Sequence, residues 1–270
     1  MPGISLTTSL IKEYETMFNS CVIKPEQVRN VERIVSTLLS YKARYQSVST
    51  LMGAPWFFIG AIHNMESNLN FNCHLHNGDP LAAHTVHVPA GRPKNGTPPF
   101  TWEESARDAL AMRGLSADTE WSLAGILYQL EAYNGWGYRM KRPEAFTPYL
   151  WSYSNHYTTG KFVADDRWSE TAVSKQCGAA VILRRLAELS EISFSDQPLL
   201  PNSVKPLIIH FADAKSHDSA EVAKTIALQQ WLNTFAGIFV KVDGIPGART
   251  SDAYQKVVGT YLPGDPRATA

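Results

Sequence analysis

The chain has few cysteines, no long apolar run and no surplus of charge of either sign. Each of these absences argues against one class of protein. Its three cysteines, Cys21, Cys73 and Cys177, are an odd and widely spaced set. They predict no disulfide framework, although a single bridge stays open. No stretch approaches the ~18 apolar residues of a membrane-spanning helix. Basic and acidic side chains number 25 each, so no overall charge attracts nucleic acid or an anionic membrane.

The beginning of the chain also lacks the basic and apolar regions of a secretory signal. A role outside the cytoplasm would therefore require another route of delivery. Hydrophobic residues make up 44% of the 270 residues and aromatic residues 11%, a composition that can bury a sizeable core. This length suits one large domain or two of moderate size.

Apolar residues recur at helical spacing over much of the chain, whereas strand signals are weak. We expect helices over residues 6–19, 24–48, 54–66, 101–112, 120–134, 167–189, 220–233 and 248–260. Thr101 and Glu104 form a capping-box pattern at the start of one of them. Residues 67–100 have no helical period and predict an irregular or short-stranded lobe. Serine, aspartate and proline accumulate near residues 194–203, which predicts a linker between domains over 1–193 and 204–270.

Glu66 ends an apolar predicted helix, and this position predicts an acid with an unusual pKa. Phe58, Ile59 and Ile62 precede it on the same helical face. Burial there disfavours the ionised carboxylate, and the negative end of the helix dipole opposes a further negative charge. A glutamic acid that keeps its proton near neutral pH suits general acid catalysis. The alternative is a solvated helix end with no special role.

Two motifs in the first domain resemble the lysozyme-like superfamily. "MESNLNFN", which contains Glu66 and Ser67, resembles the catalytic helix end of soluble lytic transglycosylases and goose-type lysozymes. "LEAYNGWGYR", with Ala132, Tyr133 and Asn134, resembles the Ala-Tyr-Asn segment further along their cleft. The resemblance implies a mainly α chain whose catalytic domain is of the α+β lysozyme-like kind, with a small irregular or β lobe. It also implies that Glu66 donates a proton to cleave peptidoglycan between N-acetylmuramic acid and N-acetylglucosamine.

The second carboxylate of such an enzyme is less clear from the sequence, because the family's Gly-Leu-Met-Gln stretch is absent. An Asn-, His-, Gly- and Pro-rich segment stands in its place. Within it we choose Asp79 as the base that activates water, with a turn residue as the alternative. If no base is well placed, the sugar's own substituents close the ring and leave a 1,6-anhydro end. Muramidase and lytic transglycosylase both stay open.

Polar and aromatic residues near these motifs are candidates for holding the glycan. We expect the following side chains to bind substrate: Ser67, Tyr133, Asn134, Trp136 and Tyr138. The polar-aromatic stretch over residues 150–162 is a further candidate for lining the cleft.

The end of the chain resembles a three-helix peptidoglycan-binding domain. The pattern runs through "LQQWLNTFAGIFVKVDGIPGARTSDAY", and its matching residues are Leu228, Gln229, Leu232, Asn233, Val242, Asp243, Gly244, Gly247, Thr250 and Ala253. The resemblance implies that Gln229, Asn233, Asp243 and Gly244 belong to the wall-binding machinery. Such a unit would tether the enzyme and raise the local concentration of its substrate.

Two rival interpretations stay open. The set His63, Cys73, His74, His76, His84 and His87 suggests a zinc amidase or peptidase that acts on the same wall, although the Cys and His spacing is not that of a zinc motif. A non-catalytic wall-binding protein is the other. For the glycan-cleaving enzyme we expect no cofactor and no metal, bacterial peptidoglycan as the partner, and a monomer. We expect it to be made in the cytoplasm and to reach the wall after release as a phage-type endolysin, by injection, or by non-classical export.

Overall fold

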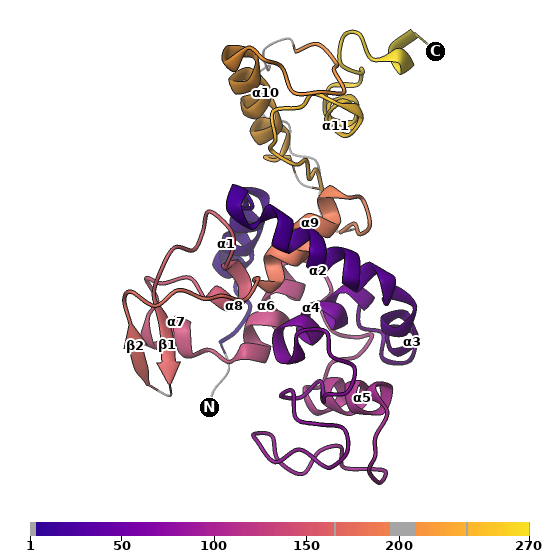
Figure 1. Cartoon of the computed structure of the whole chain (residues 1–270), viewed down its shortest axis with the longest axis vertical. Coiled ribbons are helices and arrows are strands. Elements are labelled where there is room, and N and C mark those ends of the chain that lie inside the picture. Colours follow the sequence, from indigo (N-terminus) through magenta and orange to yellow (C-terminus); the bar gives the residue numbers. More distant parts are fainter. Residues whose placement is uncertain (1–3, 165, 195–208, 236, 270) are drawn as a thin grey trace.

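The computed structural model describes residues 4–164, 166–194, 209–235 and 237–269, and this part of the chain is mainly helical, as predicted (Figure 1). The helices of the first unit are α1 (Thr8–Asn19), η1 (Pro25–Gln27), α2 (Val28–Ser40), α3 (Lys42–Met52), α4 (Trp56–Ser67), α5 (Trp102–Met112), α6 (Leu123–Asn134), α7 (Gly137–Lys141), α8 (Pro148–Trp151) and α9 (Ala179–Glu188). Among the described residues the sheet consists of two antiparallel strands, β1 (Lys161–Ala164) and β2 (Arg167–Ser169). The C-terminal unit contains α10 (Ser219–Leu232), α11 (Ala248–Val258) and η2 (Pro266–Thr269). No described helix is both long enough and apolar enough to cross a membrane.

The single helix predicted over residues 24–48 is wrong, because the chain changes direction at Tyr41. A short 3-10 turn precedes α2, and Tyr41 leaves the helical region with φ −105° and ψ 10° before α3 begins. The change of direction between α2 and α3 lets each helix bury its apolar side chains against different neighbours. Helix α2 packs against α9, and α3 packs against α4 and α5. One straight helix could not bury Leu38 and Tyr45, both fully buried, against such different neighbours.

The helix predicted over residues 167–189 is also too long. Its first residues instead form strand β2, and α9 begins only at Ala179. Gly178 caps this start where the backbone approaches α8. A Cβ atom at Gly178 would lie 2.2 Å from the carbonyl oxygen of Leu150. The close contact between α8 and α9 therefore fixes where the helix begins.

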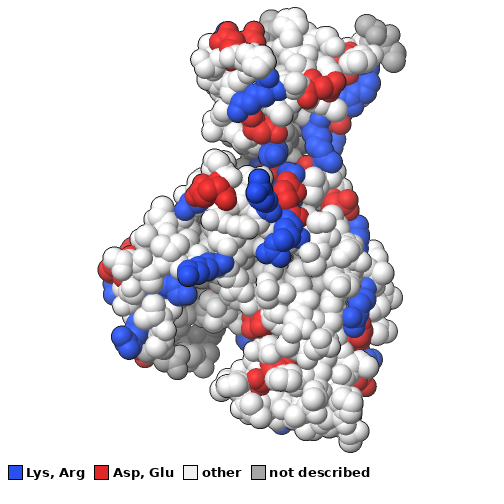
Figure 2. All heavy atoms as spheres, viewed as in Figure 1, with Lys and Arg blue, Asp and Glu red and all other residues white. Residues whose placement is uncertain are grey.

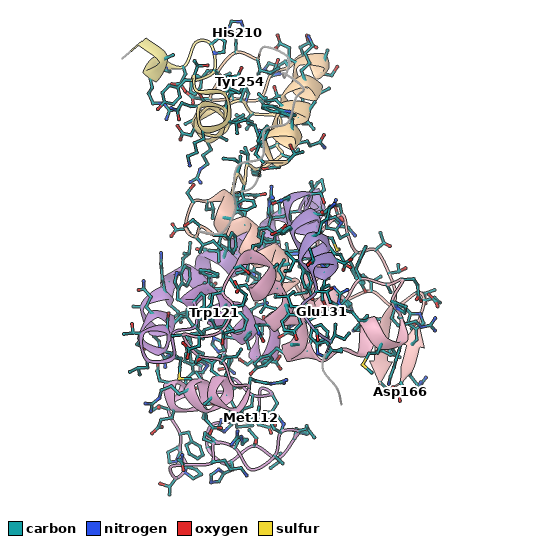
Figure 3. All side chains as sticks on the ribbon, turned by 180° about the vertical axis from the view of Figure 1, so that it is seen from behind. Met112, Trp121, Glu131, Asp166, His210 and Tyr254 are labelled. Carbon is teal, nitrogen blue, oxygen red and sulfur yellow. The ribbon has the colours of Figure 1, made fainter. Side chains whose placement is uncertain are left out.

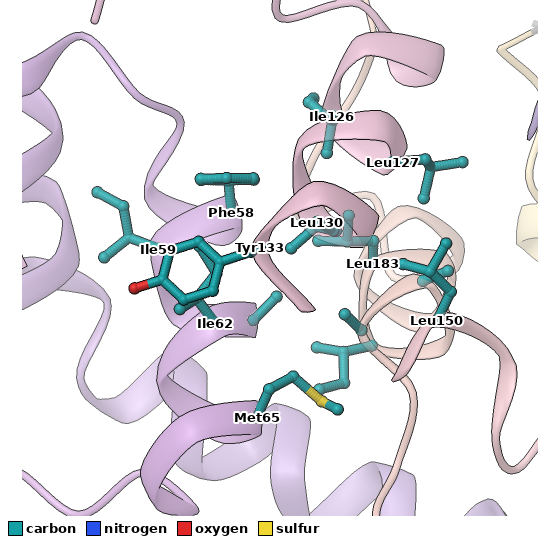
Figure 4. Close-up of a cluster of buried hydrophobic side chains, with 14 of the residues drawn as sticks. Phe58, Ile59, Ile62, Met65, Ile126, Leu127, Leu130, Tyr133, Leu150 and Leu183 are labelled. Carbon is teal, nitrogen blue, oxygen red and sulfur yellow. The ribbon is translucent and has the colours of Figure 1, made fainter. Parts of the chain in front are cut away.

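Helix α4 runs through the core and carries its last turn to the surface. Its residues 56–62 are all apolar, and a helix with apolar residues on every side is stable only when it is surrounded. Figure 4 shows Ile62 and Met65 of α4 among Leu130 of α6, Leu150 of α8 and Leu183 of α9. Because these neighbours hold α4 on several sides, the residues that follow Met65 have a defined position.

Residues 68–100 carry no helix, as predicted, and connect α4 to α5 in a lobe of loops at the bottom of Figure 1. The predicted capping box at α5 is confirmed. The Thr101 side chain accepts a hydrogen bond from the Glu104 amide at 3.2 Å, and the Glu104 carboxylate accepts one from the Thr101 amide at 2.7 Å. We call residues 68–112 the α5 lobe.

The C-terminal unit has its own small core and lies apart from the helical body, as the view from behind with His210 and Tyr254 shows (Figure 3). The residues of that core are Ile209, Leu228, Leu232, Phe235, Ile238, Val240, Ala253 and Leu262. The buried Arg184 of α9 donates a hydrogen bond to the carbonyl oxygen of Val240 at 3.4 Å, and Arg249 donates one to that of Glu188 at 2.6 Å. Most of the predicted linker, residues 195–203, lies outside the described residues.

Candidate active site

Glu66 lies in the last turn of α4, and two polar contacts fix that turn. Asn68 ends the helix in a left-handed conformation with φ 52°, and its amide donates to the carbonyl oxygen of Asn64 at 3.0 Å. The side-chain amide of Gln176 donates to the carbonyl oxygens of Met65 and Asn64 at 2.6 and 3.2 Å. These bonds satisfy carbonyl groups that the end of a helix leaves free, so the Glu66 side chain projects from a rigid base.

The carboxyl group of Glu66 is half-buried, and its pKa is raised from 4.5 to about 7. Burial is the largest cause. A hydrogen bond from the Tyr149 hydroxyl, at 3.1 Å from Oε1, and the positive charge of Arg113 lower the pKa by less than burial raises it. The raised pKa predicted from the sequence is confirmed, while the catalytic role of Glu66 stays a prediction.

Tyr133 and Arg113 form one wall beside Glu66. The buried Tyr133 hydroxyl donates to the carbonyl oxygen of Leu75 at 2.8 Å and so connects α6 to the α5 lobe. Arg113 donates to the Tyr133 carbonyl oxygen at 3.0 Å, and its guanidinium carbon lies 4.5 Å from the centre of the Tyr133 ring. Burial and the nearby Glu66 raise the pKa of Tyr133, so its hydroxyl keeps its proton.

Tyr149 and Arg113 were not predicted from the sequence. Tyr149 lies one residue before the stretch over 150–162 that the sequence marks as a possible cleft wall. Arg113 follows α5 without any motif around it. Both reach Glu66 from segments distant in the chain, and periodicity carries no signal for such contacts.

Glu131 is a second buried glutamate with a raised pKa, and its partners separate it from Glu66. Its carboxylate accepts a hydrogen bond from Tyr14 at 2.6 Å and one from Arg139 at 2.9 Å. Buried charges are normally found in such pairs. Glu131 therefore belongs to the packing of α1 against α6, and Glu66 is the better candidate for proton transfer.

A pocket of about 400 Å³ adjoins this wall and contains two of the predicted substrate-binding residues, Tyr133 and Trp136. The other three residues predicted to bind substrate, Asn134, Tyr138 and Ser67, do not line this pocket. Asn134 is exposed at the end of α6, whereas Tyr138 packs its ring 5.2 Å from that of Phe162 in β1. The Ser67 hydroxyl donates to the carbonyl oxygen of His63 at 3.2 Å, so it holds the helix end. The surface is hollowed between the hairpin side and the α5 lobe (Figure 2).

Asp79 is nearly buried, and four hydrogen bonds occupy its carboxylate. Its oxygens accept from the amides of Val86 and His87 at 2.8 and 2.9 Å, from the His87 ring at 2.6 Å and from Asn77 at 3.2 Å. Burial alone would raise the pKa of Asp79, but these bonds lower it to about 2. A carboxylate so weakly basic and so fully engaged fits the turn-residue alternative better than the activation of water.

Each of the histidines that suggested zinc forms a hydrogen bond with its ring, and all but His63 of α4 do so within the α5 lobe. The hydrogen-bond partners of their rings are Tyr45 for His63, Ser105 and Ala83 for His74, Asp108 and Ser105 for His76, Pro93 for His84 and Asp79 for His87. Within the described ranges, no three His, Cys, Asp or Glu side chains are arranged so that they could hold a metal ion, and all three cysteines are free.

The four residues predicted for wall binding shape the C-terminal unit from within. Gln229 is fully buried and forms five hydrogen bonds, among them bonds to the amides of Asp243 and Gly244 at 3.0 and 2.9 Å. Asn233 is buried and exchanges two hydrogen bonds with the Val240 backbone. Only Asp243 of the four is part-exposed. Gln229, Asn233 and Gly244 are buried and build the loop from within, and their part in wall binding stays a prediction.

Gly78 gives the first testable prediction, because it packs the α5 lobe onto the end of α4. It has φ +79°, and a Cβ atom there would lie 2.5 Å from the carbonyl oxygen of Glu66. We expect Gly78→Ala to lower the free energy of unfolding by about 2 kcal/mol or more and to reduce activity. Gly114→Ala is the matched control, since Gly114 has a similar φ of +69° but open space around it. Urea unfolding that shows equal losses for both variants would refute the contact.

None of the protein families, curated proteins or solved structures compared with this chain matches it. The support for a function therefore comes from the residues of this chain. Pockets of about 460 and 440 Å³ between the two units are as large as the one beside Tyr133. Size alone therefore does not select a site, and Glu66 remains the candidate because burial raises its pKa.

Proposed function

We propose that this protein cleaves the glycan strands of peptidoglycan with Glu66 as the general acid. The observation that carries the proposal is a half-buried carboxyl group at the end of a core helix, with a pKa of about 7. The resemblance of the segments around Glu66 and Tyr133 to lysozyme-like enzymes supports the same chemistry. Arg113 and Tyr133, which interact with this carboxyl group, line the pocket of about 400 Å³, whereas Glu66 itself is not among its lining residues.

The surroundings of Glu66 suit both states through which a general acid passes. Cleavage of a glycosidic bond needs a proton on the leaving oxygen, and burial keeps that proton on Glu66 near neutral pH. As the proton leaves, negative charge develops on the carboxylate. The Tyr149 hydroxyl and the Arg113 guanidinium favour that charged form. They therefore stabilise the transition state more than the ground state, which is the requirement for catalysis.

The same surroundings favour the lytic transglycosylase outcome over the muramidase outcome. Asp79, the carboxylate predicted to activate water, is occupied by its own hydrogen bonds and has a lowered pKa. With no base poised to activate water, the substrate's own hydroxyl would close the ring. The expected product is then a glycan with a 1,6-anhydro end.

The C-terminal unit serves in this proposal as a tether to the wall. Its resemblance to peptidoglycan-binding domains supports that role, and its separate core allows it to act as a module. The zinc amidase alternative has less support, because the histidines are committed to hydrogen bonds within the α5 lobe. The non-catalytic alternative predicts binding to the wall without release of any fragment.

A pH profile tests the assignment of Glu66. Because the acid must be protonated, activity should be retained below pH 7 and lost as the pH rises through the pKa of about 7. Tyr149→Phe removes a hydrogen bond that lowers this pKa, so the alkaline limb should move to higher pH. Tyr254→Phe in the C-terminal unit is the control and should leave the limb in place. An unchanged limb in Tyr149→Phe would argue against Glu66 as the titrating group.

A further inference from the structure

A second pocket, of about 460 Å³, lies beside the last turn of α4. This volume falls within the ~300–1,000 Å³ of small-ligand sites. Its lining residues are Asn30, Arg33, Ile34, Asn64, Asn68, Tyr153, Lys161, Ser174, Lys175, Gln176 and Cys177. We call it the basic pocket, because it is lined by three cationic side chains and no acidic one.

The three cations of the basic pocket come from separate elements and have no acidic partner. Arg33 belongs to α2, Lys161 begins β1, and Lys175 lies in the loop before α9. Within the described part of the chain, none of them forms an ion pair with aspartate or glutamate. The pocket therefore brings together three positive charges without a carboxylate beside them. Such a concavity attracts and holds anionic groups.

Amide groups surround the same pocket. Asn64 is almost fully buried, and its Oδ1 atom has no hydrogen-bond partner among the described residues. A buried polar atom without a partner is costly, and a ligand that supplies a donor would relieve the cost. Asn68 and Gln176 add further amide groups at the mouth. The pocket therefore suits a ligand that combines carboxylates with amide N–H groups, which is the chemistry of a short acidic peptide.

The last turn of α4 connects the basic pocket to Glu66, because Asn64 and Asn68 line the pocket and lie two residues before and after Glu66. Gln176 lines it and also caps the carbonyl oxygens of Asn64 and Met65, the two residues before Glu66. Tyr153, which also lines the pocket, has a left-handed backbone conformation with φ +76°. Its hydroxyl donates a hydrogen bond to the carbonyl oxygen of Lys175 at 2.5 Å. A ligand bound here would lie next to a glycan strand that is placed against Glu66.

We propose that the basic pocket binds the carboxylates of the peptide stem carried by the glycan, so that Arg33, Lys161 and Lys175 select strands with intact stems. This inference rests on the proposed function, because it places the glycan beside Glu66. Each charge-assisted hydrogen bond to a carboxylate is stronger than a neutral one, and together they make stem-bearing glycan the preferred substrate.

Binding without cleavage tests this inference separately from the proposed function. The ligands are a disaccharide-tetrapeptide, the same disaccharide without its peptide, and a disaccharide-tetrapeptide whose carboxylates are amidated. Calorimetric titration is made with full-length Glu66→Gln, which cannot consume them. We expect the first ligand to bind at least about tenfold more tightly than the other two, a preference that a few charge-assisted bonds can supply.

In this background, Arg33→Gln combined with Lys161→Gln and Lys175→Gln should bind all three ligands alike. The matched control removes three exposed cations elsewhere, Lys12, Arg107 and Lys224, and should keep the preference. The inference is overturned if the parent binds the three ligands equally, if the amidated ligand binds as tightly as the acidic one, or if both triple variants lose the preference. Absence of glycan cleavage by the wild-type protein, with the ligand preference of Glu66→Gln intact, would refute the proposed function alone.

Discussion

Replacing Glu66 by glutamine should lower the rate of glycan cleavage by about a hundred- to ten-thousand-fold, the range that a positioned general acid contributes. Glutamine keeps the size of the side chain and can still accept the hydrogen bond from Tyr149. It cannot give a proton to the leaving oxygen. The rate is measured as the release of soluble fragments from purified sacculi near pH 6, where Glu66 is mostly protonated.

The same substitution should not damage the fold, and its effect on stability has a defined sign. Between pH 4.5 and about 7 the folded protein holds the Glu66 proton more tightly than the unfolded chain does. The free energy of unfolding therefore falls as the pH rises through this window. Glu66→Gln removes that loss and should raise the melting temperature above pH 7 but not at pH 4. The exposed Glu26→Gln is the control; a rate near wild type in Glu66→Gln would refute the mechanism.

Replacing Gln229 by leucine should unfold the C-terminal unit and weaken binding to sacculi at least about tenfold. Gln229 is fully buried, and its amide bridges the backbone at Asp243, Gly244 and Ile245. Leucine is of similar size but leaves these groups without partners. Each unsatisfied buried group costs about 1–3 kcal/mol, so the loss for these three groups should be about 3–9 kcal/mol. That is a large part of the stability of a small unit.

The neighbouring Gln230 provides the matched control, because it lies on the same helix and is exposed. Gln230→Leu should keep both the fold and the binding to sacculi. Both variants should still cleave short soluble glycans, since Glu66 belongs to the first unit with its separate core. Pull-down with sacculi and proteolysis of the C-terminal unit measure the two effects. Full wall binding by a Gln229→Leu protein whose C-terminal unit has unfolded would contradict the tether.

The position of Glu66 could be predicted from the sequence because its causes are local. The apolar run before it determines a buried helix, and Asn68 ends that helix within two residues. Its polar neighbours could not be predicted in the same way. Tyr149 and Arg113 come from distant segments, and only tertiary packing brings them to the carboxyl group.

Helix boundaries show the same limit. The breaks at Tyr41 and Gly178 follow from contacts with α9 and α8, and neither position carries a strong breaking pattern in the helices predicted around it. The motif of the C-terminal unit predicted helices in the observed places, at α10 and α11. It did not predict that Gln229 and Asn233 are buried. Residues that recur in a family can stabilise the fold as well as bind a ligand.

The central claim is that Glu66 cleaves the glycan strand, and mass spectrometry of the soluble products from sacculi tests it most directly. Wild type and Glu66→Gln are compared side by side. We expect glycan fragments with intact stem peptides from wild type, one water lighter than hydrolysis products, and almost none from Glu66→Gln. Products with reducing ends would show that the glycan is cleaved by hydrolysis and not by ring closure. Cut stem peptides, no release by either protein, or equal release by both would contradict the account.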